Sequence, residues 1–249
     1  MSIVLQDVRR GFGPKVVLDG VSLEVRDGET MAVIGASGSG KSVLLKSIVR
    51  LLEPDAGRIT VDGKDVALLP REELYQLRRD VGYVFQFAAL FDSLSVFDNV
   101  AMGLRRVAGL SEAEIARAVG ESLRRVDMEG YDDRLPAQIS GGQRKRVGLA
   151  RAIATRPKYL LYDEPTSGLD PVTTAMIDEL ILRMARELGV TSVVVTHDMK
   201  SAYTVAHRIA MLYQGRIRFV GTPEEIRATE DSVVRGFIEG RPELMVEAA

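Results

Sequence analysis

The sequence predicts an α/β protein built around parallel strands. Two segments of unbroken apolar character, Tyr159–Tyr162 and Thr191–Val195, indicate strands that are covered on both faces. The amphipathic segment Thr173–Leu188 lies between them, so the three segments form a βαβ unit. Near the start of the chain, Met31–Ile34 is a further short apolar strand, and Val43–Leu52 beyond it has helical spacing. This recurrence of strand and helix defines the fold class.

The residues around this early strand predict short strands joined by turns. Ile3–Val8 and Val21–Val25 alternate between apolar and polar positions, as half-buried strands do. The pattern over residues 57–68 also predicts strand structure, with Asp62-Gly63 as a hairpin turn. The other elements predicted in this part of the chain are a turn at Arg26–Glu29, a helix over Arg71–Arg79 and a strand over Val81–Phe85.

The middle of the chain changes to helical spacing from Val96 to Met128, which predicts a helical subdomain inserted into the α/β framework. Ser111 has the residue type of an N-cap, and acidic residues follow it in the first turn. The elements predicted after this subdomain are a helix over Gly141–Thr155, a hairpin over residues 208–220 turned by Gln214-Gly215, and a helical tail from Pro223 that becomes polar.

Composition and charge exclude several classes of function. Of the 249 residues, 46% are hydrophobic and 27% charged, which is ordinary for a globular protein, and the formal net charge is −2. That balance argues against a surface devoted to nucleic acid, and we expect no nucleic-acid partner. The chain has no cysteine, which excludes disulfides and thiolate chemistry. No apolar run reaches the roughly 18 residues that span a bilayer, and no signal peptide is recognisable. We therefore expect a cytoplasmic protein whose membrane role comes through a partner.

A glycine-rich loop directly follows the strand Met31–Ile34 and leads into a helix. Its residues are Gly35, Ala36, Ser37, Gly38, Ser39, Gly40, Lys41 and Ser42. Glycines let backbone N–H groups approach an anion, and the helix N-terminus adds partial positive charge. In such a phosphate cradle Lys41 reaches the β- and γ-phosphates, and the Ser42 hydroxyl holds Mg²⁺. The alternative, a glycine-rich turn without a ligand, is disfavoured by the Lys-Ser ending and by the preceding strand.

Further polar groups stand where a strand ends or a helix begins. Ser140 precedes two glycines, Gly141 and Gly142, at the start of a predicted helix, which suits either simple capping or a second anion site. Asp163 and Glu164 end an apolar strand at the carboxyl edge of the sheet, where ligands bind. There Asp163 can hold the Mg²⁺ shell and Glu164 can polarise an attacking water, the alternative being a solvated turn.

Two histidines and one basic run remain. His197 follows the last apolar strand beside an acid, which favours a catalytic over a structural role. His207 is predicted to lie on a helix, in a structural or surface role. The run Arg144–Arg146 is predicted to be a solvated helix face with one residue near phosphate, not a nucleic-acid patch.

Over about residues 3–222 the sequence resembles the ATP-binding cassette (ABC) ATPases. Six motifs stand in the order of that family: Phe12, GASGSGKS at 35–42, Gln86, ISGGQ at 139–143, LLYDE at 160–164 and His197. There are two departures, Ile139 where leucine is usual and Phe12 where tyrosine is commoner. The resemblance implies an ABC-type P-loop fold with a mostly parallel core sheet, an antiparallel N-terminal subdomain and an inserted helical subdomain. The implied boundaries are residues 1–222 for the ATPase domain, about 87–156 for the helical subdomain and 223–249 for a C-terminal extension.

The resemblance also implies roles for particular residues. Glu164, His197 and Gln86 are expected to take part in hydrolysis of ATP, and Ser42, Gln86 and Asp163 to hold Mg²⁺, Asp163 through water. In this family two cassettes pair head to tail, so a homodimer is expected. Each chain then binds one ATP through Phe12, Gly35, Ala36, Ser37, Gly38, Ser39, Gly40, Lys41, Ser42 and Val43. It covers the partner's ATP with Ser140, Gly141, Gly142 and Gln143, and it communicates across the dimer through Ser167, Gly168, Leu169 and Asp170.

Three segments resemble one subfamily, the cassettes of the Mla/MCE phospholipid-transport systems. They are Phe87–Val100 after Gln86, Ser42–Lys46, and Val233–Gly240 in the tail. The resemblance implies an integral-membrane permease, an MCE-type periplasmic lipid-binding partner, and a place on the cytoplasmic face of the inner membrane. The alternatives are a cassette of another importer or exporter, for amino acids, lipoproteins or metal ions, and an ATPase of cluster assembly. Chains of the translation and repair types are excluded, because there is room for one cassette and no long coiled-coil insert.

Two surfaces are expected to meet partner chains. The apolar residues after Gln86 either line a groove for a short permease helix or fill the core of the helical subdomain; they are Phe87, Leu90, Phe91 and Phe97. The tail is expected to brace the dimer or contact a neighbouring chain, which truncation after Thr222 would test.

Overall fold

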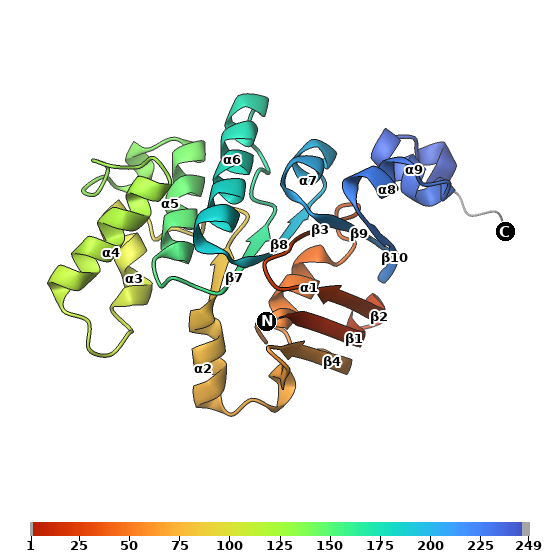
Figure 1. The fold of residues 1–249 in the computed structure, drawn as a ribbon, viewed down its shortest axis with the longest axis horizontal. Coiled ribbons are helices and arrows are strands. Elements are labelled where there is room, and N and C mark those ends of the chain that lie inside the picture. Colours follow the sequence, from red (N-terminus) through yellow and green to blue (C-terminus); the bar gives the residue numbers. More distant parts are fainter. Residues whose placement is uncertain (1, 246–249) are drawn as a thin grey trace. The chain divides into compact units, whose positions relative to one another are not determined.

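A computed structural model describes residues 2–245, so Met1 and residues 246–249 of the predicted domain and extension lie outside the described residues. The chain divides into two compact units. The first comprises Met1–Leu74 together with Thr191–Ala249, and the second comprises Tyr75–Val190. Figure 1 shows the order of their elements along the chain.

The first unit contains an antiparallel sheet near the N-terminus. Its strands are β1 (Ile3–Phe12), β2 (Lys15–Val25), β4 (Ala56–Val61) and β5 (Lys64–Asp65), in the order β2-β1-β4-β5. Ile3 pairs with Val25 on one side and Val61 on the other. The strand predicted over 57–68 is wrong at its end, because residues Val66–Leu68 form a 3₁₀ turn, η1. The Asp65 side chain caps this turn by accepting from the Ala67 N–H, a local bond that competes with strand pairing.

The same unit contains strands of the core sheet. The parallel strand β3 (Thr30–Ile34) lies between β8 (Thr191–Thr196) and β9 (Arg208–Tyr213), and β10 (Arg216–Gly221) pairs antiparallel with β9. Every residue of β3 and β8 is buried, as expected of parallel strands covered on both faces. Helices α1 (Lys41–Ile48) and α7 (Met199–Val205) follow β3 and β8 in the chain.

The helical position predicted for His207 is wrong. Helix α7 ends at Val205, and His207 lies in a bend before β9. Its backbone N–H donates to the Thr30 carbonyl at 2.9 Å, and its Nδ1 accepts from the Thr30 N–H at 2.9 Å. His207 therefore has the structural role that its sequence position suggested, and this role ties β3 to β9.

The chain after Thr222 is part of the core of the first unit. Helices α8 (Pro223–Arg227) and α9 (Ser232–Glu239) lead to a 3₁₀ turn, η3 (Pro242–Met245). The three fully buried side chains of the tail, Ile226, Val233 and Val234, belong to one apolar cluster with side chains of β3 and β9. Truncation after Thr222 would therefore uncover the hydrophobic core, and it would test stability as well as assembly.

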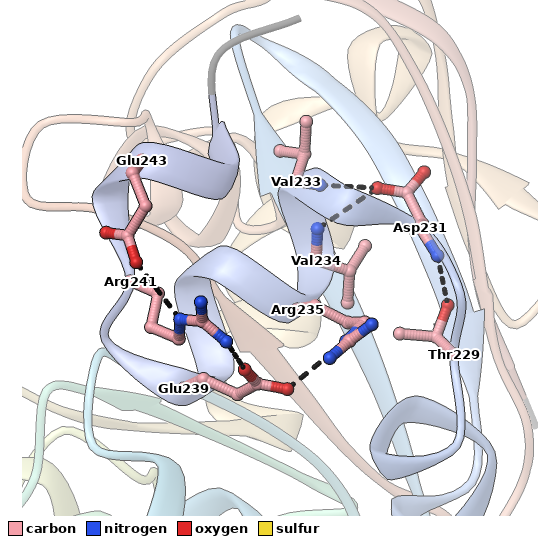
Figure 2. A network of polar contacts seen from close by, with 8 residues as sticks. All are labelled: Thr229, Asp231, Val233, Val234, Arg235, Glu239, Arg241 and Glu243. Atoms are coloured by element: carbon pink, nitrogen blue, oxygen red, sulfur yellow. Dashed lines mark hydrogen bonds and ion pairs between the residues drawn. The ribbon is translucent and has the colours of Figure 1, made fainter.

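Polar contacts hold the end of this tail together. Figure 2 shows Asp231 accepting from the N–H groups of Val233 and Val234 at the start of α9. Arg241 pairs with Glu243 at 3.0 Å and with Glu239 at 3.4 Å. These ion pairs are half-exposed, so the apolar cluster contributes more to stability than they do.

The second unit pairs two parallel strands, β6 (Val81–Val84) and β7 (Tyr159–Asp163), and its other elements are helical. Helix α2 (Arg71–Asp80) crosses the boundary between the units. In the chain between β6 and β7 lie α3 (Val96–Leu104), α4 (Glu112–Arg125), the 3₁₀ turn η2 (Pro136–Gln138) and α5 (Gly141–Ile153); α6 (Pro171–Leu188) follows β7. Helices α3, α4 and α5 pack against one another (Figure 1). The Ser111 N-cap is confirmed, with a full capping box to Glu114.

The predicted α/β class is confirmed, with its mostly parallel core strands and N-terminal antiparallel sheet. Within residues 2–245, no helix combines the length and the apolar character needed to cross a bilayer.

Candidate functional site

The loop Gly35–Ser42 joins β3 to α1 in the first unit, and two of its glycines are required by geometry. A Cβ at Gly35 would collide with the carbonyl oxygen of Leu212. Gly40 has φ +105°, and a Cβ there would lie 2.9 Å from Val17. Residues with side chains rarely adopt such a φ, so the path of the loop follows from its glycines.

Lys41 lies inside this loop and is 5% exposed. Its Nζ donates to the carbonyls of Gly35 at 2.8 Å and Ala36 at 3.1 Å, so the loop wraps around a buried ammonium. The N-cap of α1 is Gly40, which offers no side chain to the N–H groups of the first turn. The buried Oγ of Ser39 has no hydrogen-bond partner. Three features of the loop suit the oxygens of a phosphate chain. They are the positive charge of Lys41, a helix N-terminus without a side-chain cap, and the buried Ser39 hydroxyl without a hydrogen-bond partner.

Two further predicted site residues belong to the first unit and are exposed. Phe12 is 45% exposed at the end of β1, with the Arg10 guanidinium 4.9 Å from its ring centre. His197 directly follows β8 and is also exposed. Asp198, the acid beside it, caps α7 by accepting from the N–H groups of Lys200 and Ser201.

The predicted acid pair lies at the end of β7 in the second unit. Asp163 and Glu164 are only 5% and 8% exposed, which is unlike a solvated turn. The Tyr83 hydroxyl donates to Asp163 Oδ2 at 3.1 Å. Burial raises the pKa of Tyr83, and the Asp163 carboxylate raises it further, so Tyr83 stays a hydrogen-bond donor. Glu164 has φ +49°, a left-handed backbone that is uncommon for residues with a side chain.

Other predicted residues are gathered around Glu164. The Gln86 side-chain amide donates to Ser167 Oγ at 3.4 Å, and the Ser167 N–H donates to the Glu164 carbonyl at 3.2 Å. Gly168 follows with φ +76°, and the Asp170 carboxylate caps α6. The second unit thus brings Gln86, Ser167 and Glu164 into one hydrogen-bonded group, which Gly168 and Asp170 follow in the chain.

The Ser-Gly-Gly turn opens α5 in the same unit. Ser140 accepts from the Gln143 N–H at 3.2 Å, while Gln143 Oε1 accepts from the Ser140 N–H at 2.8 Å, so the predicted N-cap is confirmed as a capping box. Gly142 is close to α6, since a Cβ there would lie 2.6 Å from the Thr173 methyl group. Gly141 is exposed and carries no side chain, which leaves the helix start accessible.

The solvated face predicted for the basic run after this turn is wrong for Lys145 and Arg146, whereas Arg144 is exposed. Lys145 is 7% exposed, and its Nζ donates to the carbonyls of Gln86 and Glu164. Arg146 has a side chain only 12% exposed, held near Asp127. The burial of Lys145 could have been predicted from helical spacing. The positions three, four and seven residues after it are buried and lie on the same face of α5.

The apolar residues after Gln86 do not all fill the core. Phe87 is 84% exposed and Phe91 is 53% exposed, whereas Leu90 and Phe97 are half-buried. The core interpretation is therefore wrong for Phe87 and Phe91. The exposure of these two rings is compatible with the groove interpretation.

Comparison with known proteins assigns a family to this arrangement. The family model described as "ABC transporter" matches residues 18–167. The chain is 39% identical over 241 residues to the "Probable ribonucleotide transport ATP-binding protein mkl" of Mycobacterium leprae, covering 97% of this chain and 70% of that protein. It is 47% identical over 226 residues to the "Methionine import ATP-binding protein MetN" of Caulobacter vibrioides, covering 90% and 68%. It is 43% identical over 242 residues to the "Sulfate/thiosulfate import ATP-binding protein CysA" of the same organism, covering 96% and 70%.

Solved structures agree with the family. The ATP-binding cassette MJ0796, seen as a dimer in "a post-hydrolysis state" bound to ADP and Pi, is 34% identical, with a TM-score of 0.80 over 89% of this chain and 98% of that one. The cassette cbiO1 of Clostridium perfringens, part of a complex named cbiONQ, is 30% identical, with a TM-score of 0.83 over 97% and 96%. The chain therefore belongs to the ABC transporter family, as an ATP-binding subunit that hydrolyses ATP.

Proposed function

We propose the following roles in the binding of ATP. The backbone of Gly35–Ser42, with Val43, holds the phosphates, and Lys41 neutralises the β- and γ-phosphates. The Phe12 ring stacks on the adenine, which needs only an exposed aromatic face. The buried Lys41 at a helix start without a side-chain cap is the observation that carries this part of the proposal.

We propose that Glu164 polarises the attacking water and that His197 and Gln86 take part in the same step. A general base must be held in place and kept from solvation, and Glu164 is buried on a left-handed backbone at a strand end. Gln86 is bonded to Ser167, whose N–H is bonded to the carbonyl of Glu164. This group supports a shared role for Gln86 and Glu164.

The donor set also suits Mg²⁺. Ser42, Gln86 and Asp163, the last through water, would offer hydroxyl, amide and carboxylate oxygens, which this hard cation prefers. When bound, the ion supplies positive charge that neutralises the phosphate oxygens. Residues 2–245 contain no cluster of three or more His, Asp or Glu side chains arranged as a metal cage.

We propose that the active form is a homodimer with two ATP sites. Ser140, Gly141, Gly142 and Gln143 of one copy would cover the ATP held by the other copy, and Ser167, Gly168, Leu169 and Asp170 would communicate between the sites. The exposed Gly141 at a capped helix start supports this role. The dimeric relative bound to ADP and Pi supports the pairing.

The substitution Glu164→Gln tests the catalytic proposal. It keeps the size and burial of the side chain but removes the base, so we expect binding of ATP to persist while turnover falls by about 10²-fold or more. Glu129→Gln is the matched control, because Glu129 is an exposed partner of Arg124. Hydrolysis by Glu164→Gln at the wild-type rate would remove Glu164 from the mechanism.

We further propose that hydrolysis energises phospholipid transport between membranes, with an integral-membrane permease and an MCE-type lipid-binding partner. The chain would then act at the cytoplasmic face of the inner membrane. The exposed Phe87 and Phe91, which follow directly from Gln86, carry the permease part of the proposal. A short helix of the permease would pack against these apolar rings. Because the rings follow Gln86 in the chain, a change at Gln86 would alter this contact.

A second candidate is import of a small solute. The identity of 47% to a methionine importer subunit and of 43% to a sulfate/thiosulfate importer subunit favours this alternative over a role in cluster assembly. Capture of the tagged chain from membranes, with lipid analysis of the complex, separates the two functions. Co-purified MCE-domain protein and phospholipid support lipid transport, whereas a solute-binding protein without lipid supports import.

The docking surface needs its own control. Phe91→Glu should weaken capture of the permease while ATP binding is kept. Leu68→Glu introduces the same charge at a residue that is 78% exposed in the first unit, and it should leave capture unchanged. Equal capture with both variants would contradict a permease surface at Phe91.

A further inference from the structure

Lys145 is a buried cation that the proposed mechanism does not yet use. It lies on α5, five residues after Ser140, and is 7% exposed. Its Nζ donates to the backbone carbonyl of Gln86 and, at 3.3 Å, to that of Glu164. One ammonium thus joins the two residues of this unit that are proposed to act on the attacking water.

One of these carbonyls belongs to a residue with a left-handed backbone, and the other lies two and three positions before two such residues. Glu164 has φ +49°, and the residues after Gln86 include Ala88 at φ +59° and Ala89 at φ +47°. Non-glycine residues in this region persist only where their surroundings hold them. A fixed donor between the two segments is a direct way to hold them.

Two more positions on α5 hold the same loop. The Arg151 guanidinium donates to the carbonyls of Ala88 and Ala89 at 2.5 and 2.7 Å. Gly148 lets Ala88 approach, because a Cβ there would lie 3.2 Å from the Ala88 Cβ. Lys145, Gly148 and Arg151 are spaced three residues apart, so one face of α5 contacts Gln86 and the loop that follows it.

The two carbonyls need a donor at this place, and the Lys145 ammonium supplies one. A methionine of similar shape would fill the space but would donate to neither carbonyl.

Building on the proposed function, we infer that Lys145 is a positioning residue for ATP hydrolysis, which fixes the backbones of Gln86 and Glu164 relative to one another. It acts through these two residues and is not itself a catalytic residue. Because α5 begins with the Ser-Gly-Gly turn, the same lysine also connects that turn to the glutamate of its own chain.

The test compares Lys145→Met, Lys145→Arg and a matched control, Lys158→Met, in the purified full chain. Lys158 is a half-exposed partner of Asp80 in the same unit. For Lys145→Met we expect kcat to fall about 10- to 100-fold with KM for ATP nearly unchanged, since misplacement by about 1 Å has costs of this size. Lys145→Arg, which keeps the donors, should recover part of kcat, and Lys158→Met should match wild type.

Hydrogen exchange supplies a second readout. Amides of residues 85–92 should exchange faster in Lys145→Met and at the wild-type rate in Lys158→Met. A wild-type kcat in Lys145→Met, a change confined to KM, or equal loss with methionine and arginine would overturn the inference. If Lys145→Met does not fold, Lys145→Gln against Lys145→Arg decides in the same way.

The two proposals fail differently. An inactive Glu164→Gln together with a fully active Lys145→Met would refute only the role of Lys145. An active Glu164→Gln would refute the proposed mechanism itself.

Discussion

Gly82, in strand β6, is predicted to be the least replaceable glycine outside the turns of the second unit. A Cβ at Gly82 would lie 2.5 Å from the Ala152 carbonyl oxygen of α5 and 2.6 Å from Leu160 Cδ2 of β7. Ordinary contacts begin at 3.4 Å, so the two neighbours would have to move by about 0.9 and 0.8 Å. The first neighbour is backbone and cannot rotate away. We expect Gly82→Ala to destabilise the protein by about 2–3 kcal/mol, the upper part of the overpacking range.

Thermal unfolding followed by circular dichroism measures this effect. For a chain of this length the expected loss is a decrease of about 4–12 °C in Tm. Gly120→Ala is the control, because Gly120 lies in α4 with no atom within 4 Å of its Cβ position. That substitution should raise stability by about 0.5–1 kcal/mol through helix propensity. If both variants melted at or above the wild-type temperature, the close approach of β6 to α5 would be refuted.

Three further predictions concern the loop at Phe91 and the tail. Asn99 is fully buried, and it both accepts from the N–H and donates to the carbonyl of Phe91, so Asn99→Ala should cost about 2–4 kcal/mol in urea unfolding. Burial raises the pKa of Asp231, but two N–H groups of α9 and the Arg218 guanidinium lower it more, to below its usual value. The ionised Asp231 carboxylate stabilises the folded protein fully above the pKa of about 4 that it has in the unfolded chain, and this stabilisation is lost as the pH falls through the lower pKa of the folded state. Asp231→Asn should therefore flatten the acid side of a curve of Tm against pH. A Cβ at Gly236 would lie 2.7 Å from the nearest atom of η3, so Gly236→Val should release η3 and speed proteolysis after residue 241.

Much of the fold followed from local pattern. The strands at Met31–Ile34, Tyr159–Tyr162 and Thr191–Val195 were predictable because unbroken apolar runs leave few alternatives in a chain of this kind. The caps at Ser111 and Ser140 were predictable because their partners lie three residues away. The predicted fold was wrong at two places. At Val66–Leu68 the Asp65 side chain caps a 3₁₀ turn, and at His207 the hydrogen-bond partner is Thr30 of the distant strand β3.

The candidate site divides in the same way. The Gly35–Ser42 loop and the Asp163-Glu164 pair are contiguous in sequence, so their chemistry was readable from residue types and spacing. The burial of Lys145 was not, because a lysine in a basic run is ordinarily solvated. Its ammonium gains partners only through the approach of Gln86, 59 positions away, and of Glu164, 19 positions away.

Residue types and their spacing were enough to identify the class of the fold, the phosphate-binding loop and the acids at the strand end, since each depends on residues within a few positions of one another. The three-dimensional packing was needed to show that Phe87 and Phe91 are exposed, that Gly82 must be glycine, and that Lys145 bonds both Gln86 and Glu164. These features depend on distances between segments far apart in the chain. Such distances are set by how whole elements pack, and no local pattern contains them.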